Sequence, residues 1–116
     1  MEAFDMTETV ASTQETLDSI HHLAIAVQDV AASVRWYQDN FACRVAYQDA
    51  TWALLKFANT SMALVIPAQH PPHIGIQVDD AARFGTLTTH RDGTRSVYVN
   101  DPDGNALEMM ARDNPV

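Results

Sequence analysis

The sequence predicts an α+β domain built from two similar βαβββ halves, the second shortened. The segment that begins at His22 (His-Leu-Ala-Ile-Ala-Val-Gln-Asp) reappears 51 residues later at His73 as His-Ile-Gly-Ile-Gln-Val-Asp-Asp. Each copy alternates along a strand and then runs into a helical pattern. Short runs rich in β-forming residues follow both copies, with turn residues between them. An internal repeat of this kind indicates a duplicated structural unit.

In the first half, the alternation after Ile20 predicts a strand that carries His22, Ala24 and Ala26 on one face. Asp29 is a suitable N-cap for the helical pattern that follows, because its side chain can accept a backbone hydrogen bond. Turn-like segments then separate three further apolar runs. We therefore expect a strand, a helix and three strands at residues 20–27, 30–40, 42–47, 51–57 and 61–66.

In the second half, the proline-rich residues 67–72 form a joint, since proline cannot continue a central strand. The segment Asp101-Pro-Asp-Gly104 is typical of a tight turn. We expect a strand, a short helical turn and two strands at residues 73–78, 81–87, 94–100 and 105–111, with a further strand doubtful. The second half is thus shorter than the first by about a strand or a helical turn.

The 116 residues predict a leader (1–18) and a single domain (19–116) with modules at 19–67 and 72–113. The leader carries −5 of the net charge of −8 and lacks the basic start of a signal peptide. The mild acidity of the rest argues against nucleic acid as a partner, and the apolar runs are too short to cross a membrane. One cysteine, Cys43, rules out an intrachain disulfide and fits a cytoplasmic location.

The closing strands extend the repeat, because Ala63 in the first half aligns with Glu108 in the second. The four equivalent inward positions therefore hold His22, Ala63, His73 and Glu108. A carboxylate within an apolar strand is costly to bury unless it is paired or binds a metal. Two histidines and one carboxylate on separate strands form a triad that suits Fe²⁺, Mn²⁺, Co²⁺, Ni²⁺ or Zn²⁺.

A simpler interpretation is that His22 and His73 are ordinary sheet histidines and that Glu108 pairs with Arg44 or Arg95. For one isolated histidine that interpretation would be preferred. The repeated pair, with a carboxylate in the matching position, favours a metal site.

Four segments resemble the vicinal oxygen chelate superfamily, which includes glyoxalase I, methylmalonyl-CoA epimerase, fosfomycin-resistance enzymes, extradiol dioxygenases and bleomycin-resistance proteins. They are the two repeat copies, the segment Ser-Val-Arg-Trp-Tyr that ends at Tyr37, and the segment Ser-Val-Tyr-Val-Asn-Asp-Pro-Asp-Gly-Asn-Ala-Leu-Glu that ends at Glu108. The resemblance covers residues 20–112. It implies paired βαβββ modules that curl into a half-open barrel around a metal, and a small-molecule substrate.

The resemblance carries over the ligand roles to His22, His73 and Glu108. Glyoxalase I-like enzymes usually have another carboxylate on the fourth strand, where this chain has Ala63. The remaining His, His, Glu set looks like that of extradiol dioxygenases and fosfomycin-resistance enzymes. In both groups a tyrosine near the metal lies ten residues before the glutamate, as Tyr98 does here. Tyr98 is therefore a candidate catalytic hydrogen-bond donor, or else a strand tyrosine that packs for its area.

Several other residues have weaker expectations. Trp52 is a candidate for stacking on a ring-bearing ligand, and Gln77 is a candidate substrate contact because it shares the predicted face of His73. By strand alternation, His21 should point away from His22. His70 and His90 lie in predicted loops and are expected to be exposed, with acid–base chemistry as the alternative.

These patterns favour a metal-dependent enzyme that acts on a small oxygen-bearing substrate chelated by the ion. Dioxygenase-like or transferase-like chemistry is slightly preferred, and lyase or isomerase chemistry is possible. The alternative is a non-catalytic drug-binding or metabolite-binding protein of the bleomycin-resistance kind. The shortened second half suggests a homodimer, since we expect one chain to leave its own cup incompletely closed.

Overall fold

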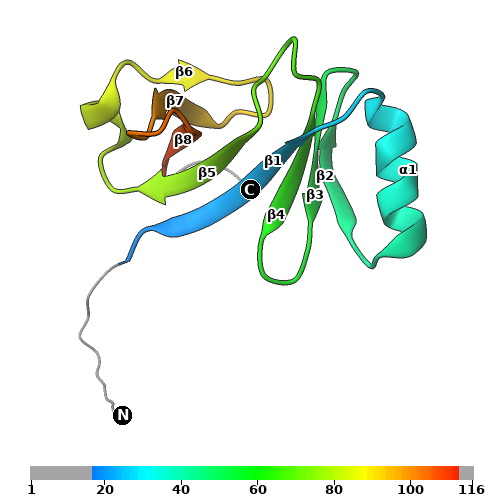
Figure 1. Cartoon of the computed structure of the whole chain (residues 1–116). Coiled ribbons are helices and arrows are strands. Elements are labelled where there is room, and N and C mark those ends of the chain that lie inside the picture. Colours follow the sequence, from blue (N-terminus) through cyan, green and yellow to red (C-terminus); the bar gives the residue numbers. More distant parts are fainter. Residues whose placement is uncertain (1–16, 113–116) are drawn as a thin grey trace, which may run out of the picture.

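The described part of the chain, residues 17–112, forms one curled eight-stranded sheet with a single α-helix (Figure 1) in this computed structural model. The strand order is β2-β3-β4-β1-β5-β8-β7-β6. Residues 1–16 of the expected leader and residues 113–116 lie outside the described residues. The elements are β1 (Ser19–Ala26), α1 (Val30–Asn40), β2 (Arg44–Gln48), β3 (Trp52–Lys56), β4 (Ser61–Val65), β5 (His73–Val78), the 3-10 helix η1 (Ala81–Phe84), β6 (Thr88–Thr89), β7 (Arg95–Asn100) and β8 (Ala106–Ala111).

The sheet keeps the symmetry of the sequence repeat. β1 pairs with β4 in parallel, β5 pairs with β8 in parallel, and β1 and β5 join the two halves in an antiparallel pair. Ala24 lies opposite Ala63, and Gly75, which is 51 residues after Ala24, lies opposite Glu108. The predicted α+β class and the half-open barrel of paired modules are thus confirmed.

The first half follows the prediction closely. Asp29 caps α1, because its Oδ1 accepts a hydrogen bond from the backbone N–H of Ala32 at 3.0 Å. The helix buries Val30 and Val34 against β3 and β4, where Leu55 and Leu64 are fully enclosed. This packing leaves the opposite face of β3 and β4 for a cavity.

The second half keeps its strands but has little helix. The expected helical turn is the one-turn η1, and the doubtful strand is the two-residue β6. The expected turn before β8 is present, with Gly104 at φ +87° donating its N–H to the carbonyl of Asp101 at 3.0 Å. Alternation along β8 packs Met109 into the core beside η1, so its neighbour Glu108 points to the concave face.

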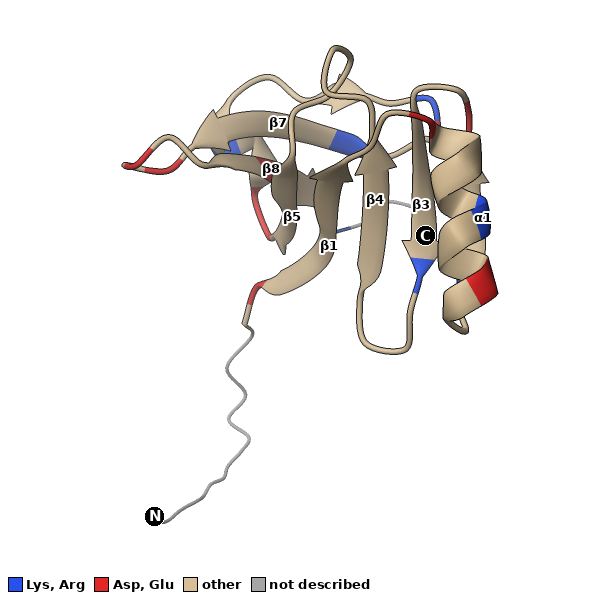
Figure 2. Ribbon diagram, turned by 45° about the vertical axis from the view of Figure 1, so that its right-hand side comes forward, with Lys and Arg blue, Asp and Glu red and all other residues tan. Residues whose placement is uncertain are grey.

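The surface charges of the described residues are dispersed. Figure 2 shows lysine and arginine segments spread over α1, the strands and the loops, with no single basic face. None of the described helices combines the length and the apolar character that a bilayer crossing requires.

Candidate metal centre

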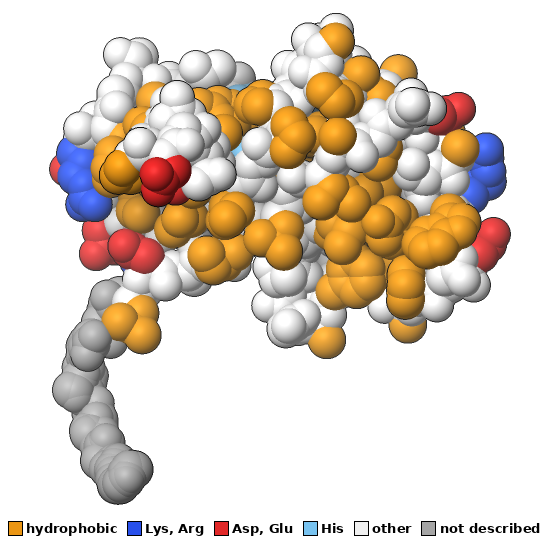
Figure 3. Space-filling model, viewed as in Figure 1, with side chains coloured by type: hydrophobic (Ala, Val, Ile, Leu, Met, Phe, Trp, Pro, Cys, Tyr) orange, Lys and Arg blue, Asp and Glu red, His pale blue; other side chains and the backbone are white. Residues whose placement is uncertain are grey.

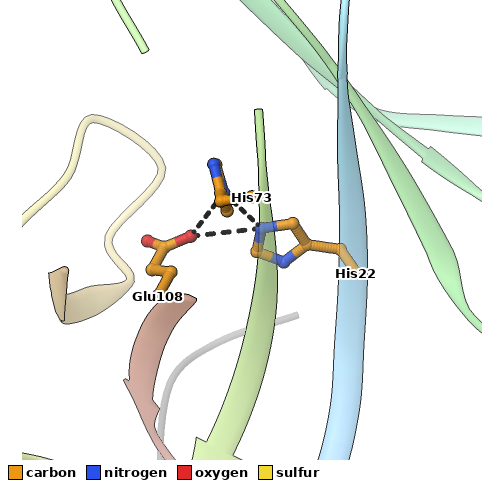
Figure 4. A group of neighbouring side chains, drawn as sticks. All are labelled: His22, His73 and Glu108. Atoms are coloured by element: carbon orange, nitrogen blue, oxygen red, sulfur yellow. Dashed lines mark hydrogen bonds and ion pairs between the residues drawn. The ribbon is translucent and has the colours of Figure 1, made fainter. Parts of the chain in front are cut away.

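Three side chains from three strands converge on the concave face of the sheet. His22 extends from β1, His73 from the start of β5 and Glu108 from β8, as the close-up view shows (Figure 4). Their residues are only 5%, 8% and 5% exposed. These are the three ligands predicted from the sequence, and the fold brings them together within one chain.

The three donor atoms are almost equidistant. His22 Nε2 lies 3.0 Å from His73 Nε2, and Glu108 Oε1 lies 3.1 Å and 3.0 Å from the same two nitrogens. Neighbouring ligands of an octahedral ion with bonds of about 2.1 Å are about 3.0 Å apart, against about 3.4 Å for a tetrahedral ion. The spacing therefore matches one face of an octahedron.

The protonation of His73 is set by its second nitrogen. His73 Nδ1 lies 2.6 Å from the backbone oxygen of Pro71. A carbonyl oxygen only accepts hydrogen bonds, so Nδ1 carries the proton. In the neutral imidazole this leaves a lone pair on Nε2, which is the form that binds a metal.

His22 is supported by its neighbour His21, which corrects the sequence expectation. The register between β1 and β5 shifts between Ile20 and His22, and this bulge breaks the alternation. His21 Nδ1 consequently lies 2.8 Å from His22 Nδ1 instead of pointing away. When His22 Nδ1 donates that hydrogen bond, its Nε2 is free to act as a ligand.

The second oxygen of Glu108 has its own partners. Ser96 Oγ donates to Glu108 Oε2 at 2.5 Å, and His90 Nε2 lies 2.6 Å from Ser96 Oγ and 3.3 Å from Oε2. Burial alone would raise the pKa of Glu108, but its close contacts with the imidazole rings of His22, His73 and His90 hold that pKa well below the usual range. Glu108 is thus a carboxylate, and Oε1 is the oxygen that faces the histidines.

These donors fit a divalent cation. With the lone pair of His73 Nε2 facing Glu108 Oε1 at 3.0 Å, two electron-rich atoms would repel each other unless a proton or a cation lay between them. The other nitrogen or oxygen of each side chain already has a partner: Pro71 for His73, His21 for His22 and Ser96 for Glu108. His22, His73 and Glu108 also form a group that could hold a metal ion by the mutual distances of their ligand atoms.

The triad lies in a cavity that encloses about 540 Å³ of empty space, part of it open to solvent. All five histidines of the chain line this cavity. The sequence expectation that His70 and His90 are exposed was wrong, because both are partly buried. The other lining residues are Trp52, Leu54, Ala63, Val65, Arg91, Asp92, Thr94, Tyr98 and Met110.

The predicted substrate-contacting residues separate into two groups. Trp52 lines the cavity, stacked on Tyr47 at a ring-centroid distance of 4.5 Å. Gln77 lies outside the lining, and its Oε1 accepts a hydrogen bond from Ser19 Oγ at 3.2 Å. Its role in substrate binding stays a prediction.

Tyr98 lies directly across the sheet from Glu108 and its ring meets His73 edge-on, with centroids 5.0 Å apart. Burial, and after it the charge of Glu108, raises the pKa of Tyr98 above its usual value. The phenol is therefore neutral at physiological pH and can donate a hydrogen bond. Its catalytic role stays a prediction.

Ala63 occupies the position that mirrors Glu108. It is 2% exposed, and its methyl group lines the cavity where a fourth ligand would otherwise extend. The structure thus brings together three oxygen or nitrogen donors on one side of the cavity and leaves the fourth equivalent position apolar.

Sequence reasoning missed Ser96, His90 and His21 as partners of the triad. Ser96 could have been found from alternation, since it shares a face with Tyr98. The position of His90 depends on the loop between β6 and β7, and that of His21 on the bulge. Neither feature has a clear signal in the sequence.

A comparison with protein families decides the membership of the chain. The family model of the Glyoxalase/Bleomycin resistance protein/Dioxygenase superfamily matches residues 19–109. The chain belongs to this superfamily. No functionally curated protein matches it in sequence.

Solved structures of other proteins share the fold of this chain. A methylmalonyl-CoA epimerase from Streptomyces coelicolor is 17% identical with a TM-score of 0.67, over 87% of this chain and 99% of that one. A hypothetical protein from Bacillus halodurans is 12% identical with a TM-score of 0.66, over 87% and 99%. Homoprotocatechuate 2,3-dioxygenase from Brevibacterium fuscum is 15% identical with a TM-score of 0.59, over 82% of this chain and 34% of the dioxygenase. The TM-scores show that the fold is shared, and sequence identities this low leave the activity of this chain open.

Proposed function

We propose that the protein is a metal-dependent enzyme that acts on a small oxygen-bearing substrate held at the triad of His22, His73 and Glu108. The convergence of three buried donor atoms at about octahedral spacing carries this proposal. The divalent ion could be Fe²⁺, Mn²⁺, Ni²⁺, Co²⁺ or Zn²⁺, because these ligands accept all five.

Each group of residues in the cavity has a separate role in this proposal. His22, His73 and Glu108 would hold the ion, which as a Lewis acid stabilises negative charge on a substrate oxygen. Tyr98, neutral beside His73, donates a hydrogen bond to that oxygen. The ring of Trp52 offers an apolar face to the rest of the substrate, and the wall of Leu54, Val65 and Met110 excludes water.

Two classes of reaction are compatible with the residues around the triad. Dioxygenase-like or transferase-like chemistry needs open positions on the ion and no second carboxylate, and Ala63 supplies none. Lyase or isomerase chemistry needs a base, and His70 supports this second candidate. His70 lines the cavity, its Nε2 is buried without a hydrogen-bond partner, and burial lowers its pKa so that the ring is neutral.

Metal analysis of protein purified without chelators tests the proposal. We expect one transition-metal ion per chain, or one equivalent bound when apo-protein is titrated with Co²⁺ or Mn²⁺. Addition of a catechol, which binds through two neighbouring oxygens, should then shift the visible spectrum of the Fe³⁺-loaded or Co²⁺-loaded protein. Protein that neither contains nor binds a stoichiometric ion would favour the alternative, a drug-binding or metabolite-binding protein without chemistry.

We also propose a homodimer, formed through the convex face of the central strands. Leu23 on β1 and Ile74 on β5 lie opposite each other and are 41% and 37% exposed, and Ile25 is next to them. α1 packs on β2, β3 and β4 and η1 packs on β7 and β8, and Figure 3 shows hydrophobic side chains at the surface of both halves. A second copy would bury the strip by a two-fold contact.

Light scattering tests the dimer. The protein should elute at twice its monomer mass, and Leu23→Asp or Ile74→Asp should convert it to monomer. Because all three donors come from one chain, the monomeric variants should still bind one metal ion. A parent protein that remains monomeric at high concentration would exclude the dimer without affecting the metal site.

A further inference from the structure

We propose that Ser96, backed by His90, is a positioning residue that restricts Glu108 to a single metal-binding oxygen. The positions opposite the triad then stay open for a substrate and a small co-ligand. This inference rests on the proposed function, because it concerns how the ion is bound. It assigns roles to two residues that are not ligands themselves.

The hydrogen bonds around Glu108 have only one consistent direction. A glutamate that binds a metal is a carboxylate, so Glu108 Oε2 only accepts, and the single hydroxyl proton of Ser96 goes to it at 2.5 Å. Since that proton is committed, His90 Nε2 must donate its own proton to Ser96 Oγ at 2.6 Å. The chain of donors therefore runs from His90 through Ser96 to the carboxylate.

This arrangement decides how Glu108 can bind. A carboxylate binds a divalent ion through one oxygen or through both, and the second oxygen is available only when nothing else holds it. Oε2 accepts a short, charge-assisted hydrogen bond, which is among the stronger kinds in proteins. To bind through both oxygens, Glu108 would have to give up that bond inside the protein.

Water offers little compensation at this position. Ser96 is 1% exposed and Glu108 is 5% exposed, so an Oε2 released from Ser96 has little access to water, and His90 Nε2, at a longer 3.3 Å, is the donor that remains beside it. The register of β7 and β8 keeps Ser96 close to Glu108. Ser96 is opposite Met110 and Tyr98 is opposite Glu108, so Ser96 and Glu108 are diagonal neighbours on one face of the sheet. His90 completes the arrangement from the cavity wall, where it is half-buried.

Ser96→Ala tests the inference with Mn²⁺ bound to the 116-residue chain. Without the hydroxyl, Oε2 should turn to the ion and occupy one open position. Water-proton relaxation should then show about one exchangeable water fewer than in the parent, and catechol should bind at least about 10-fold more weakly, within the range typical of outer-sphere changes. Ser96→Thr retains the hydroxyl and should restore both readouts.

Two further variants separate positioning from general damage. Ser61→Ala removes a similarly buried hydroxyl outside the cavity lining, and should leave water count and catechol affinity at parent values. His90→Ala keeps the direct contact of Ser96 with Glu108, so its effect should be smaller than that of Ser96→Ala. Thermal unfolding of every variant identifies any that fail to fold.

Each outcome has a distinct meaning. If the parent protein binds no ion, the proposed function fails and this inference fails with it. If the parent binds Mn²⁺ and Ser96→Ala matches its water count and catechol affinity, only this inference is overturned. Loss of metal from Ser96→Ala, with Ser96→Thr unable to restore it, would also overturn it, because Ser96 would then support the site without setting the binding mode of Glu108.

Discussion

Replacing His73 with alanine should abolish stoichiometric metal binding. The change leaves two of three donors and also removes the contact that His73 makes with Glu108 at 3.0 Å. Loss of an outer-sphere partner typically lowers metal affinity by about 10-fold to 100-fold, so loss of a direct ligand should lower it by at least about 100-fold. Titration of apo-protein with Co²⁺ in competition with a chromophoric chelator measures the affinity.

His70→Ala is the matched control for this prediction. His70 lies in the same cavity as His73 but is not part of the triad. Its replacement should leave metal stoichiometry and affinity close to the parent values. Unchanged metal content in His73→Ala would refute the ligand assignment, and equal losses in both variants would indicate a general disturbance of the cavity.

Replacing Gly75 with alanine should displace the ring of His22 and weaken metal binding by at least about 10-fold. A Cβ at this position would lie 2.2 Å from His22 Cε1 and 2.5 Å from Nδ1, far inside normal contact distance. The ring of His22 cannot move freely, because His21 and Glu108 hold its two nitrogens. Overpacking of this kind also costs about 1–3 kcal/mol of stability.

Gly104→Ala separates the two effects of Gly75→Ala. Gly104 adopts φ +87° with nothing near the missing Cβ, so alanine there should cost about 1 kcal/mol through backbone strain alone. Its metal affinity should equal that of the parent. A Gly75→Ala protein that folds and binds metal as tightly as the parent would show that His22 does not act as a ligand from its observed position.

The repeat explains why so much of the fold could be predicted. Two copies of one pattern place His22 and His73 on equivalent strands, and strand alternation then gives each side chain its face. The same reasoning put Glu108 on the concave face, because Leu107 and Met109 must pack into the core. Strand period and apolar pattern are local properties, so the sequence expresses them directly.

The outer contacts of the triad could not be predicted in the same way. His21 depends on a bulge, which moves one residue out of the alternation that the prediction assumed. His90 depends on the path of the loop from β6 to β7, where no periodic pattern exists. Side chains placed by irregular backbone are set by tertiary packing, which a single sequence leaves undetermined.

The proposed metal site spans the boundary between the two halves of the repeat, where β1 pairs with β5. One donor, His22, belongs to the first half, and the other two belong to the second. An ion bound at the triad would therefore cross-link the duplicated halves, and its binding free energy would be added to the stability of the native state through ligand linkage. Because this cross-link would join both halves, the concentration of the ion would change the stability of the whole domain and not of one half alone.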